Sequence, residues 1–171
     1  MAGAPAYLAA QDAAGDRPAG MRVLSTCLTL PDETTRAVLN LGPDDPVVDI
    51  RRVRVAGGAP ISLEHAQFPA ALVPGLLDHQ LGGSITDILR VRFGLMIGEV
   101  DERIEAVNAT PNEAALLGVK PKSALLLITR VVRDRHGVIC EFSRDLVNGD
   151  TTCLAVRADG GSDVALVTRE A

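Results

Sequence analysis

The sequence predicts a single α+β domain, in which a mostly antiparallel sheet carries its helices packed on one side. Short segments with the composition of β-strands are joined by Gly-rich turns, and segments with helix-start signals lie between them. The chain has 171 residues, of which 47% are hydrophobic but only 2% aromatic. It is therefore long enough to bury an aliphatic core without needing disulfides or a metal.

The chain begins with a segment that does not have the pattern of a folded element. Residues 1–20 are rich in Gly, Ala and Pro and lack hydrophobic periodicity, so we expect a linker or disordered segment there and the domain over 21–171. A strand is expected over 21–29. A helix should follow over 31–41, because proline and two acids occupy its first turn and Gly-Pro follows its end.

Residues 47–69 are expected to form a β-hairpin with its charged side chains on one face. A three-residue Gly-Gly-Ala turn would place Arg52 opposite Glu64. The same register puts Arg54 opposite Ser62, while Val, Ile and Leu line the other face. A two-residue turn would instead mix the arginines with apolar side chains, so we prefer the three-residue register.

The rest of the chain alternates capped helices with strands. We expect a short helical or irregular stretch over 69–77, a helix over 85–93 capped by Ser84, a strand over 98–108, a helix from Thr110 to about Gly118, and strands over 124–132, 138–147, 152–157 and 164–168.

An internal repeat is visible in these elements. Shifting the sequence by 78 positions aligns one helix and strand with a later helix and strand, and Arg52 with Arg130. After the turn an offset of 77 aligns Glu64 with Glu141. We therefore expect a pseudo-repeat of helix–strand–turn–strand. A two- or four-residue turn in the second hairpin would set Arg130 opposite Glu141.

Composition argues against several classes of protein. The formal net charge is −5 and the arginines are interspersed with acids, which is not typical of a nucleic-acid-binding surface. The sequence has no membrane-spanning apolar run and no signal-peptide pattern, so we expect no membrane association and a cytoplasmic location. Cys27, Cys140 and Cys153 are expected to be small buried hydrophobic residues. We expect no metal and no cofactor.

The charged hairpin could bind an anion. Arg52 and Arg54 leave the same face of a strand, and guanidinium groups form paired hydrogen bonds with carboxylates and phosphates. Ser84 begins a helix whose free N–H groups also favour an anion. Glu64 and Glu141 would accept hydrogen bonds from hydroxyl or amino groups of a ligand. The alternative is a set of cross-strand ion pairs on an exposed face, with no ligand.

Patterns typical of catalysis are poorly represented. The three histidines, His65, His79 and His136, show no spacing that suggests a metal site or the base of a nucleophile. The phosphate-loop, dinucleotide-binding and zinc-protease motifs are absent from the sequence. The residues thus favour small-molecule binding over catalysis.

The order and spacing of several segments resemble the UTRA domain, the effector-binding half of HutC-type GntR transcription regulators. The resemblance runs from about Arg22 to Val156. It is carried by RVLS at 22–25, LNLGPDDPVVDIRRVRVAGGAPISLEHAQFP at 39–69, VPGL at 73–76, GSITDILRVRFG at 83–94 and the segment from ERIEAVN to CEFS at 102–143.

The resemblance implies a chorismate-lyase-like antiparallel fold, a homodimer, and binding of a small anionic or polar metabolite. It implies that DNA is contacted only through a winged helix-turn-helix, which this chain lacks, and that the ligand modulates that contact. By position, it assigns the effector site to Arg52, Arg54, Glu64, Ser84, Thr86, Glu141 and Ser143. Asn148 stands where arginine is common in relatives, which argues against a sugar phosphate as the effector.

Three functions remain open on this basis. The first, which we favour, is an effector-sensing domain that binds without turnover. The second is a chorismate-lyase-like enzyme on the same fold, which would release pyruvate from chorismate. The third is a dimerisation module without a ligand.

Overall fold

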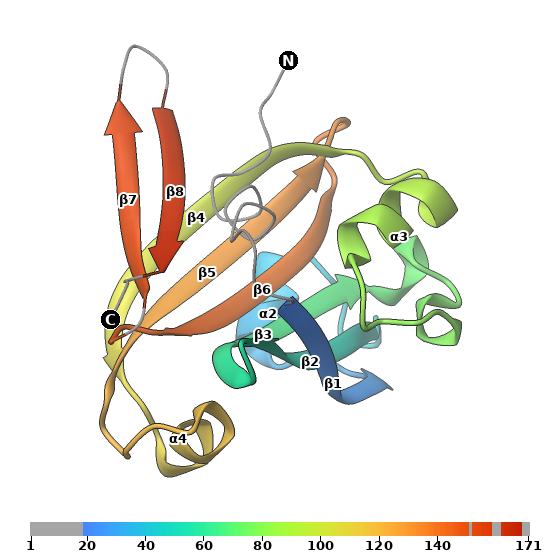
Figure 1. Cartoon of the computed structure of the whole chain (residues 1–171). Coiled ribbons are helices and arrows are strands. Elements are labelled where there is room, and N and C mark those ends of the chain that lie inside the picture. Colours follow the sequence, from blue (N-terminus) through green and yellow to red (C-terminus); the bar gives the residue numbers. More distant parts are fainter. Residues whose placement is uncertain (1–18, 151, 159–161, 169–171) are drawn as a thin grey trace.

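A six-stranded antiparallel sheet forms the centre of the computed structural model, which describes residues 19–150, 152–158 and 162–168 (Figure 1). The strand order is β1-β2-β3-β6-β5-β4, and a separate two-stranded sheet pairs β7 with β8. The strands are β1 (Ala19–Thr29), β2 (Val47–Ala56), β3 (Ala59–Pro69), β4 (Ile97–Asn108), β5 (Ala124–Asp134), β6 (Ile139–Asn148), β7 (Thr152–Ala158) and β8 (Ser162–Thr168). The α+β prediction is confirmed. Of the segment expected to be a linker, residues 1–18 lie outside the described residues.

The helices pack on both faces of the sheet, so the expectation that they share one side is wrong. They are α2 (Glu33–Val38), α3 (Ile85–Phe93) and α4 (Pro111–Leu117), with 3-10 turns η1 (Ala70–Leu72) and η2 (Leu76–Asp78). The α3 segment packs on the face that contains Val48 and Phe68. The clusters around α2 and α4 use Val47 and Leu125, which point the other way because strand residues alternate.

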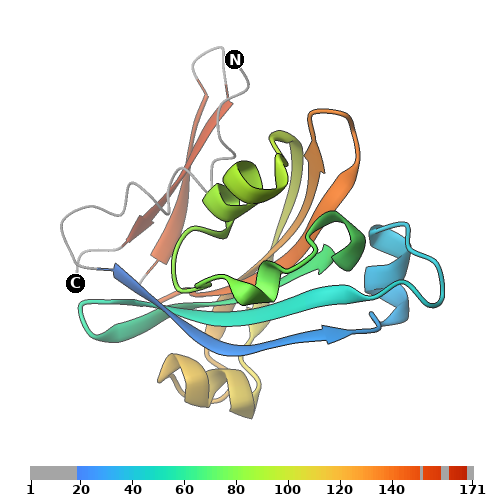
Figure 2. The same cartoon turned by 90° about the vertical axis from the view of Figure 1, so that its right-hand side faces the viewer.

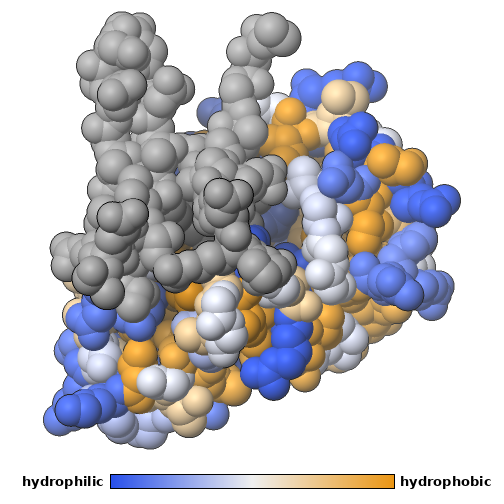
Figure 3. Space-filling view, in the orientation of Figure 1, coloured by the Kyte–Doolittle hydropathy of each residue, from blue (hydrophilic) through white to orange (hydrophobic). Residues whose placement is uncertain are grey.

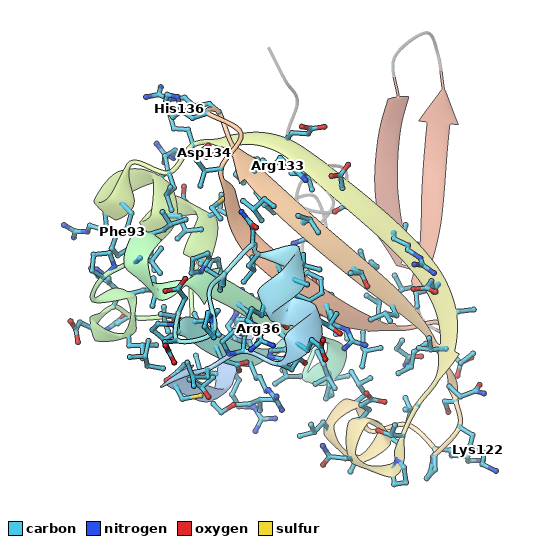
Figure 4. All side chains as sticks on the ribbon, turned by 180° about the vertical axis from the view of Figure 1, so that it is seen from behind. Arg36, Phe93, Lys122, Arg133, Asp134 and His136 are labelled. Carbon is cyan, nitrogen blue, oxygen red and sulfur yellow. The ribbon has the colours of Figure 1, made fainter. Side chains whose placement is uncertain are left out.

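Two views of the ribbon agree with this arrangement, and a third shows the character of the surface. Figure 2 shows α3 and α4 on opposite sides of the strands. Seen from behind in Figure 4, α2 with its labelled Arg36 lies in front of the sheet. The described part of the surface in Figure 3 carries hydrophobic patches among hydrophilic residues. Val91 on α3, with 64% exposure, is the most exposed of the large hydrophobic residues described.

The pseudo-repeat is present in three dimensions. The two copies are β1-α2-β2-β3 and β4-α4-β5-β6, and their last strands, β3 and β6, pair at the centre of the sheet. The helix caps also correspond, since Asp32 and Thr110 lie 78 positions apart and each accepts a hydrogen bond from a backbone N–H in the first turn. The repeat therefore gives the sheet two similar halves.

The first hairpin has the predicted register but a different turn. Arg52 lies opposite Glu64 and the next charged residue, Arg54, opposite Ser62. The turn is only the two glycines at 57–58, which both have positive φ (60° and 82°), as a type I′ turn requires. A bulge just after Arg54 shifts the register by one residue and so restores the predicted pairing.

The second hairpin differs from the prediction in its pairing. Arg130 lies opposite Ser143, and Glu141 lies opposite Val132. One cause is a three-residue turn over 135–137, which is closed by a hydrogen bond from the Asp134 N–H to the Val138 carbonyl and lies beside the labelled Asp134 and His136 in Figure 4. The other is a bulge between Val132 and Arg133, which shifts the register by one more residue. The structural counterpart of Glu64 is therefore Ser143, and the offset of 77 was wrong.

Two further expectations need correction. The helix expected over 31–41 ends at Val38, because Asn40 takes a left-handed conformation (φ 54°) that ends helices. Cys27 is exposed, since it lies on the edge strand β1, whereas Cys140 is buried as expected and burial raises the pKa of its thiol to about 12. The side chain of Cys153 lies outside the described residues.

Within the described ranges, no helix is long and apolar enough to cross a membrane.

Candidate binding site

The Arg52–Glu64 pair is buried, which excludes the exposed ion-pair reading for these two residues. The residue exposures are 9% and 7%, and Arg52 Nη2 donates to Glu64 Oε2 over 2.6 Å. The pair lies on the sheet face that α3 partly covers. A buried ion pair of this kind is strongly destabilised when only one partner is removed.

Arg52 also fixes the loop that leads into α3. Its Nη1 donates to the carbonyl oxygens of Leu81 (3.0 Å) and Gly83 (2.9 Å). Immediately after these residues, the exposed Ser84 caps the helix, with its Oγ accepting from the Asp87 N–H over 3.1 Å. One guanidinium therefore connects β2, β3 and the start of α3.

A second arginine organises the other half of the same face. Arg130 donates from Nε to Glu102 Oε1 (2.9 Å) and from Nη2 to Asp145 Oδ2 (3.1 Å). Its Nη1 donates to Ser143 Oγ (3.4 Å) and lies 3.6 Å from Glu141 Oε1. Arg130 is only 4% exposed. Because Arg130 is buried and already paired with these side chains, its contacts stabilise the fold as well as being able to line a ligand site.

The two halves meet at Glu64 and Asp145, which lie directly opposite each other on β3 and β6. We call the residues Arg52, Glu64, Asp145 and Arg130, together with their neighbours Arg54, Ser62, Glu102, Glu141 and Ser143, the charged row. All of them project from one face of the sheet.

Burial changes the proton affinities within the charged row. Loss of solvation raises the pKa of Asp145 to about 7; nearby Glu64 and Glu141 add to the rise, and Arg130 opposes it. Burial also raises the pKa of Glu141, again against the effect of Arg130. Although burial alone would lower it, the surrounding carboxylates raise the pKa of Arg130 above its ordinary value. Asp145 is therefore protonated in part of the molecules near neutral pH.

Arg54 is the more accessible arginine on β2. Its side chain is 17% exposed against 10% for Arg52, and its Nε lies 3.5 Å from Glu64 Oε1. The opposing Ser62 is 3% exposed, and its Oγ has no hydrogen-bond partner among the residues described. Arg54 is thus the most exposed arginine of the charged row, and the Ser62 Oγ opposite it is a polar atom without a hydrogen-bond partner among the described residues.

The structure brings together most of the residues expected in the site. Arg52 and Arg54 both contact Glu64, and Ser84 adjoins the loop that Arg52 holds. Glu141 and Ser143 join the row through Arg130. Thr86, which is half-buried in the first turn of α3, makes no hydrogen bond or ion pair among the described side chains.

Asp145 is one of four charged-row residues that the sequence reasoning did not place in the site, the others being Ser62, Glu102 and Arg130. The signal was present, because Glu141, Ser143 and Asp145 follow one another at every second position and therefore share a face of β6. Taken together, the arginines can bind a carboxylate or phosphate, and the carboxylates can accept hydrogen bonds from hydroxyl or amino groups.

Comparisons with known proteins point to one family. The family described as "UTRA domain" matches residues 14–152 of the chain. The chain is 28% identical over 131 residues to the HTH-type transcriptional repressor NagR of Bacillus subtilis, covering 77% of the chain and 54% of NagR. It is 32% identical over 122 residues to the HTH-type transcriptional repressor PhnF of Mycolicibacterium smegmatis, covering 70% of the chain and 49% of PhnF. The chain thus spans about half the length of these relatives.

A solved structure supports the same relationship. The effector domain of PhnF from Mycobacterium smegmatis superposes with a TM-score of 0.77 at 28% identity. The superposition covers 84% of this chain and 87% of that domain. The similarity therefore concerns the effector half of the relative.

Proposed function

The chain belongs to the UTRA domain family, and from this membership we propose that it is the effector-binding and dimerising part of a bacterial GntR-type regulator of the HutC subfamily. The UTRA domain is homologous to effector-binding domains of GntR-family regulators. Two relatives carry the description HTH-type transcriptional repressor, and the chain aligns with about half of each. In this proposal DNA is bound through a winged helix-turn-helix outside this chain, in the cytoplasm.

The proposed effector is a small anionic or polar metabolite that binds beside the charged row. Arg54 is the proposed first contact for its anionic group, because this guanidinium is more accessible than Arg52. Ser84, Thr86, Glu64, Glu141 and Ser143 are the proposed further contacts. The Ser62 Oγ, which has no hydrogen-bond partner among the described residues, supplies one more polar atom on the same face of the sheet.

One observation carries the proposal: Arg52 connects the Glu64 carboxylate to the Leu81 and Gly83 carbonyl oxygens. An anion near this guanidinium would compete with those oxygens for its N–H groups. Binding would then alter how the loop before α3 is held. A ligand can shift a conformational equilibrium only through such a difference in its contacts with the two states.

Homodimerisation is proposed through the edges of the sheet. Strands β1 and β4 each pair on one side only within the described sheet. Leu28 and Leu30, at the end of β1, are 60% and 58% exposed. Unpaired strand edges with apolar side chains favour pairing with a second chain. Light scattering on the purified chain should give the mass of a dimer.

The test is a dye-monitored thermal-shift screen with phosphorylated sugars, amino-acid catabolites and aromatic acids. We expect at least one compound to raise the melting temperature in wild type. The shift should be lost in Arg54→Gln and kept in Arg92→Gln, which changes an exposed arginine on α3. A shift that survives in an Arg52→Ala/Arg54→Ala double variant would contradict the proposed site. Release of pyruvate from chorismate would support the enzyme alternative instead.

A further inference from the structure

A cavity lies mainly on the opposite face of the sheet from the charged row. It has a volume of about 360 Å³, which is in the range of small-molecule sites. It lies between the strands and the start of α4. Its apolar lining is supplied by Leu24, Leu63, Leu116, Leu127 and Leu146.

Basic side chains line the polar side of this cavity. Arg51 lies directly opposite His65 on β3, and His65 lies directly opposite Arg144 on β6. All three line the cavity. An anion bound between the two arginines would therefore meet guanidinium groups from two different strands.

Two acids near these basic residues, Asp49 and Glu113, already have hydrogen-bond partners. Asp49 is held by His65 Nε2 at 2.6 Å, by Gln67 Nε2 at 3.0 Å and by Arg51 Nε at 3.5 Å. These contacts outweigh burial and hold the pKa of Asp49 below its ordinary value. Glu113, the acid on the rim, accepts from the Thr110 N–H over 2.8 Å in the capping box of α4.

Arg144, in contrast, is exposed and has no hydrogen-bond or ion-pair partner among the residues that the structure describes. Arg51 keeps a 58% exposed side chain despite its long contact with Asp49. Two guanidinium groups are therefore available beside a leucine-lined hollow. Such a combination selects for a ligand with both a negative charge and an apolar body.

We propose that this cavity is a second ligand site, which binds a small carboxylate with an aliphatic or aromatic body. The carboxylate lies between Arg51 and Arg144, and the body packs on the leucines. The site is back to back with the charged row, because Arg51, His65 and Arg144 alternate along β2, β3 and β6 with residues of the row. Arg52 and Glu64 of the row also contribute to the cavity lining. It does not depend on the effector assignment.

The test uses benzoate and hexanoate as probes, with benzyl alcohol and hexanol as neutral matches. Amide chemical shifts of the labelled chain are followed during titration. We expect saturable shifts at Arg51, Arg144 and α4 for the carboxylates only. Arg144→Gln should weaken binding about 10-fold or more, since it removes a charged hydrogen-bond donor.

Three controls make the outcome decisive. Arg51→Gln gives a second variant if Arg144→Gln does not fold, and Arg92→Gln should bind as wild type does. Arg54→Gln, in the charged row, should leave benzoate binding unchanged, so this test can succeed or fail separately from the proposed effector site. Equal binding of the alcohols, shifts confined to the charged row, or no saturation at all would overturn the proposal.

Discussion

Glu64 and Asp145 lie directly opposite each other on the two central strands, and each is bound by an arginine from the strand outside it. Arg52 binds Glu64 from β2, and Arg130 binds Asp145 from β5. The two arginines occupy equivalent positions in the two repeats. The charged row is therefore a product of the internal repeat, and an added anion must compete with its carboxylates for the arginines.

Replacing Arg52 should cost far more stability than replacing Arg54. Arg52→Ala leaves the buried Glu64 without its closest partner, and we expect a loss of about 3–5 kcal/mol in the free energy of unfolding. Arg54→Ala removes a longer, more exposed contact and should cost about 1 kcal/mol. Urea unfolding measures both.

The matched control for this prediction is the double variant Arg52→Leu/Glu64→Leu. It removes both charges together and should be less destabilised than Arg52→Ala, because no unpaired charge is left buried. If Arg52→Ala and Arg54→Ala proved equally stable, the structural role assigned to Arg52 would be incorrect.

The stability of the chain should depend on Asp145 in the pH range from about 4 to 7. Its pKa is raised from 3.8 to about 7 in the folded chain, so folding favours the protonated form. The contribution of Asp145 to stability is fully present below pH 4 and is lost as the pH rises through 7. The total change is up to about 4 kcal/mol.

Asp145→Asn does not titrate and is the variant that isolates this effect. Its free energy of unfolding, relative to wild type, should rise between pH 4 and pH 7 in urea titrations. Asp44→Asn, which changes an exposed carboxylate, serves as the comparison. A constant difference between Asp145→Asn and wild type across this range would refute the prediction.

The two repeat-related helix caps should contribute similarly to stability. Asp32 accepts from the Thr35 N–H over 2.7 Å, and Thr110 accepts from the Glu113 N–H over 3.3 Å. Asp32→Ala and Thr110→Ala should each cost about 1 kcal/mol by chemical unfolding. The Asp32 effect should be the larger at neutral pH, since a negative charge favours a helix N-terminus.

The pH dependence of the Asp32 cap has the opposite sign to that of Asp145. Hydrogen bonds from Thr35 lower the pKa of Asp32, so its contribution is present above about pH 4 and is lost as the pH falls further.

Asn112→Ala, an exposed change in the first turn of α4, is the control for Thr110→Ala. Equal losses for these two variants would argue against the cap as the cause.

Gly98→Ala should destabilise the sheet where β4 meets the β5–β6 turn. An added Cβ would lie 2.6 Å from the Asp134 carbonyl oxygen and 2.8 Å from the Arg135 Cα, both of which are backbone atoms. We expect a loss of about 1–3 kcal/mol, as for overpacking elsewhere. Gly20→Ala, where nothing lies within 4 Å, should be close to neutral in the same thermal or urea assay.

Much of the fold could be predicted because its signals are local. Ser84 and Thr110 cap their helices as predicted, since a cap acts within three residues of chain, whereas Asp32, expected inside a first turn, is the cap of α2. The strand alternation placed Arg52 and Glu64 on one face for the same reason. Turn geometry was less predictable, because a bulge after Arg54 compensated for the shorter turn.

The sequence by itself therefore determined the α+β class, the repeat, the first hairpin register and the identity of most charged-row residues. Only the tertiary structure decided that Arg52 and Glu64 are buried, that the helices cover both faces, and that Asp145 joins the two halves. Burial and pairing across β3 and β6 depend on residues more than 70 positions apart in the chain. No local pattern encodes the environment that such distant segments create when they pack together.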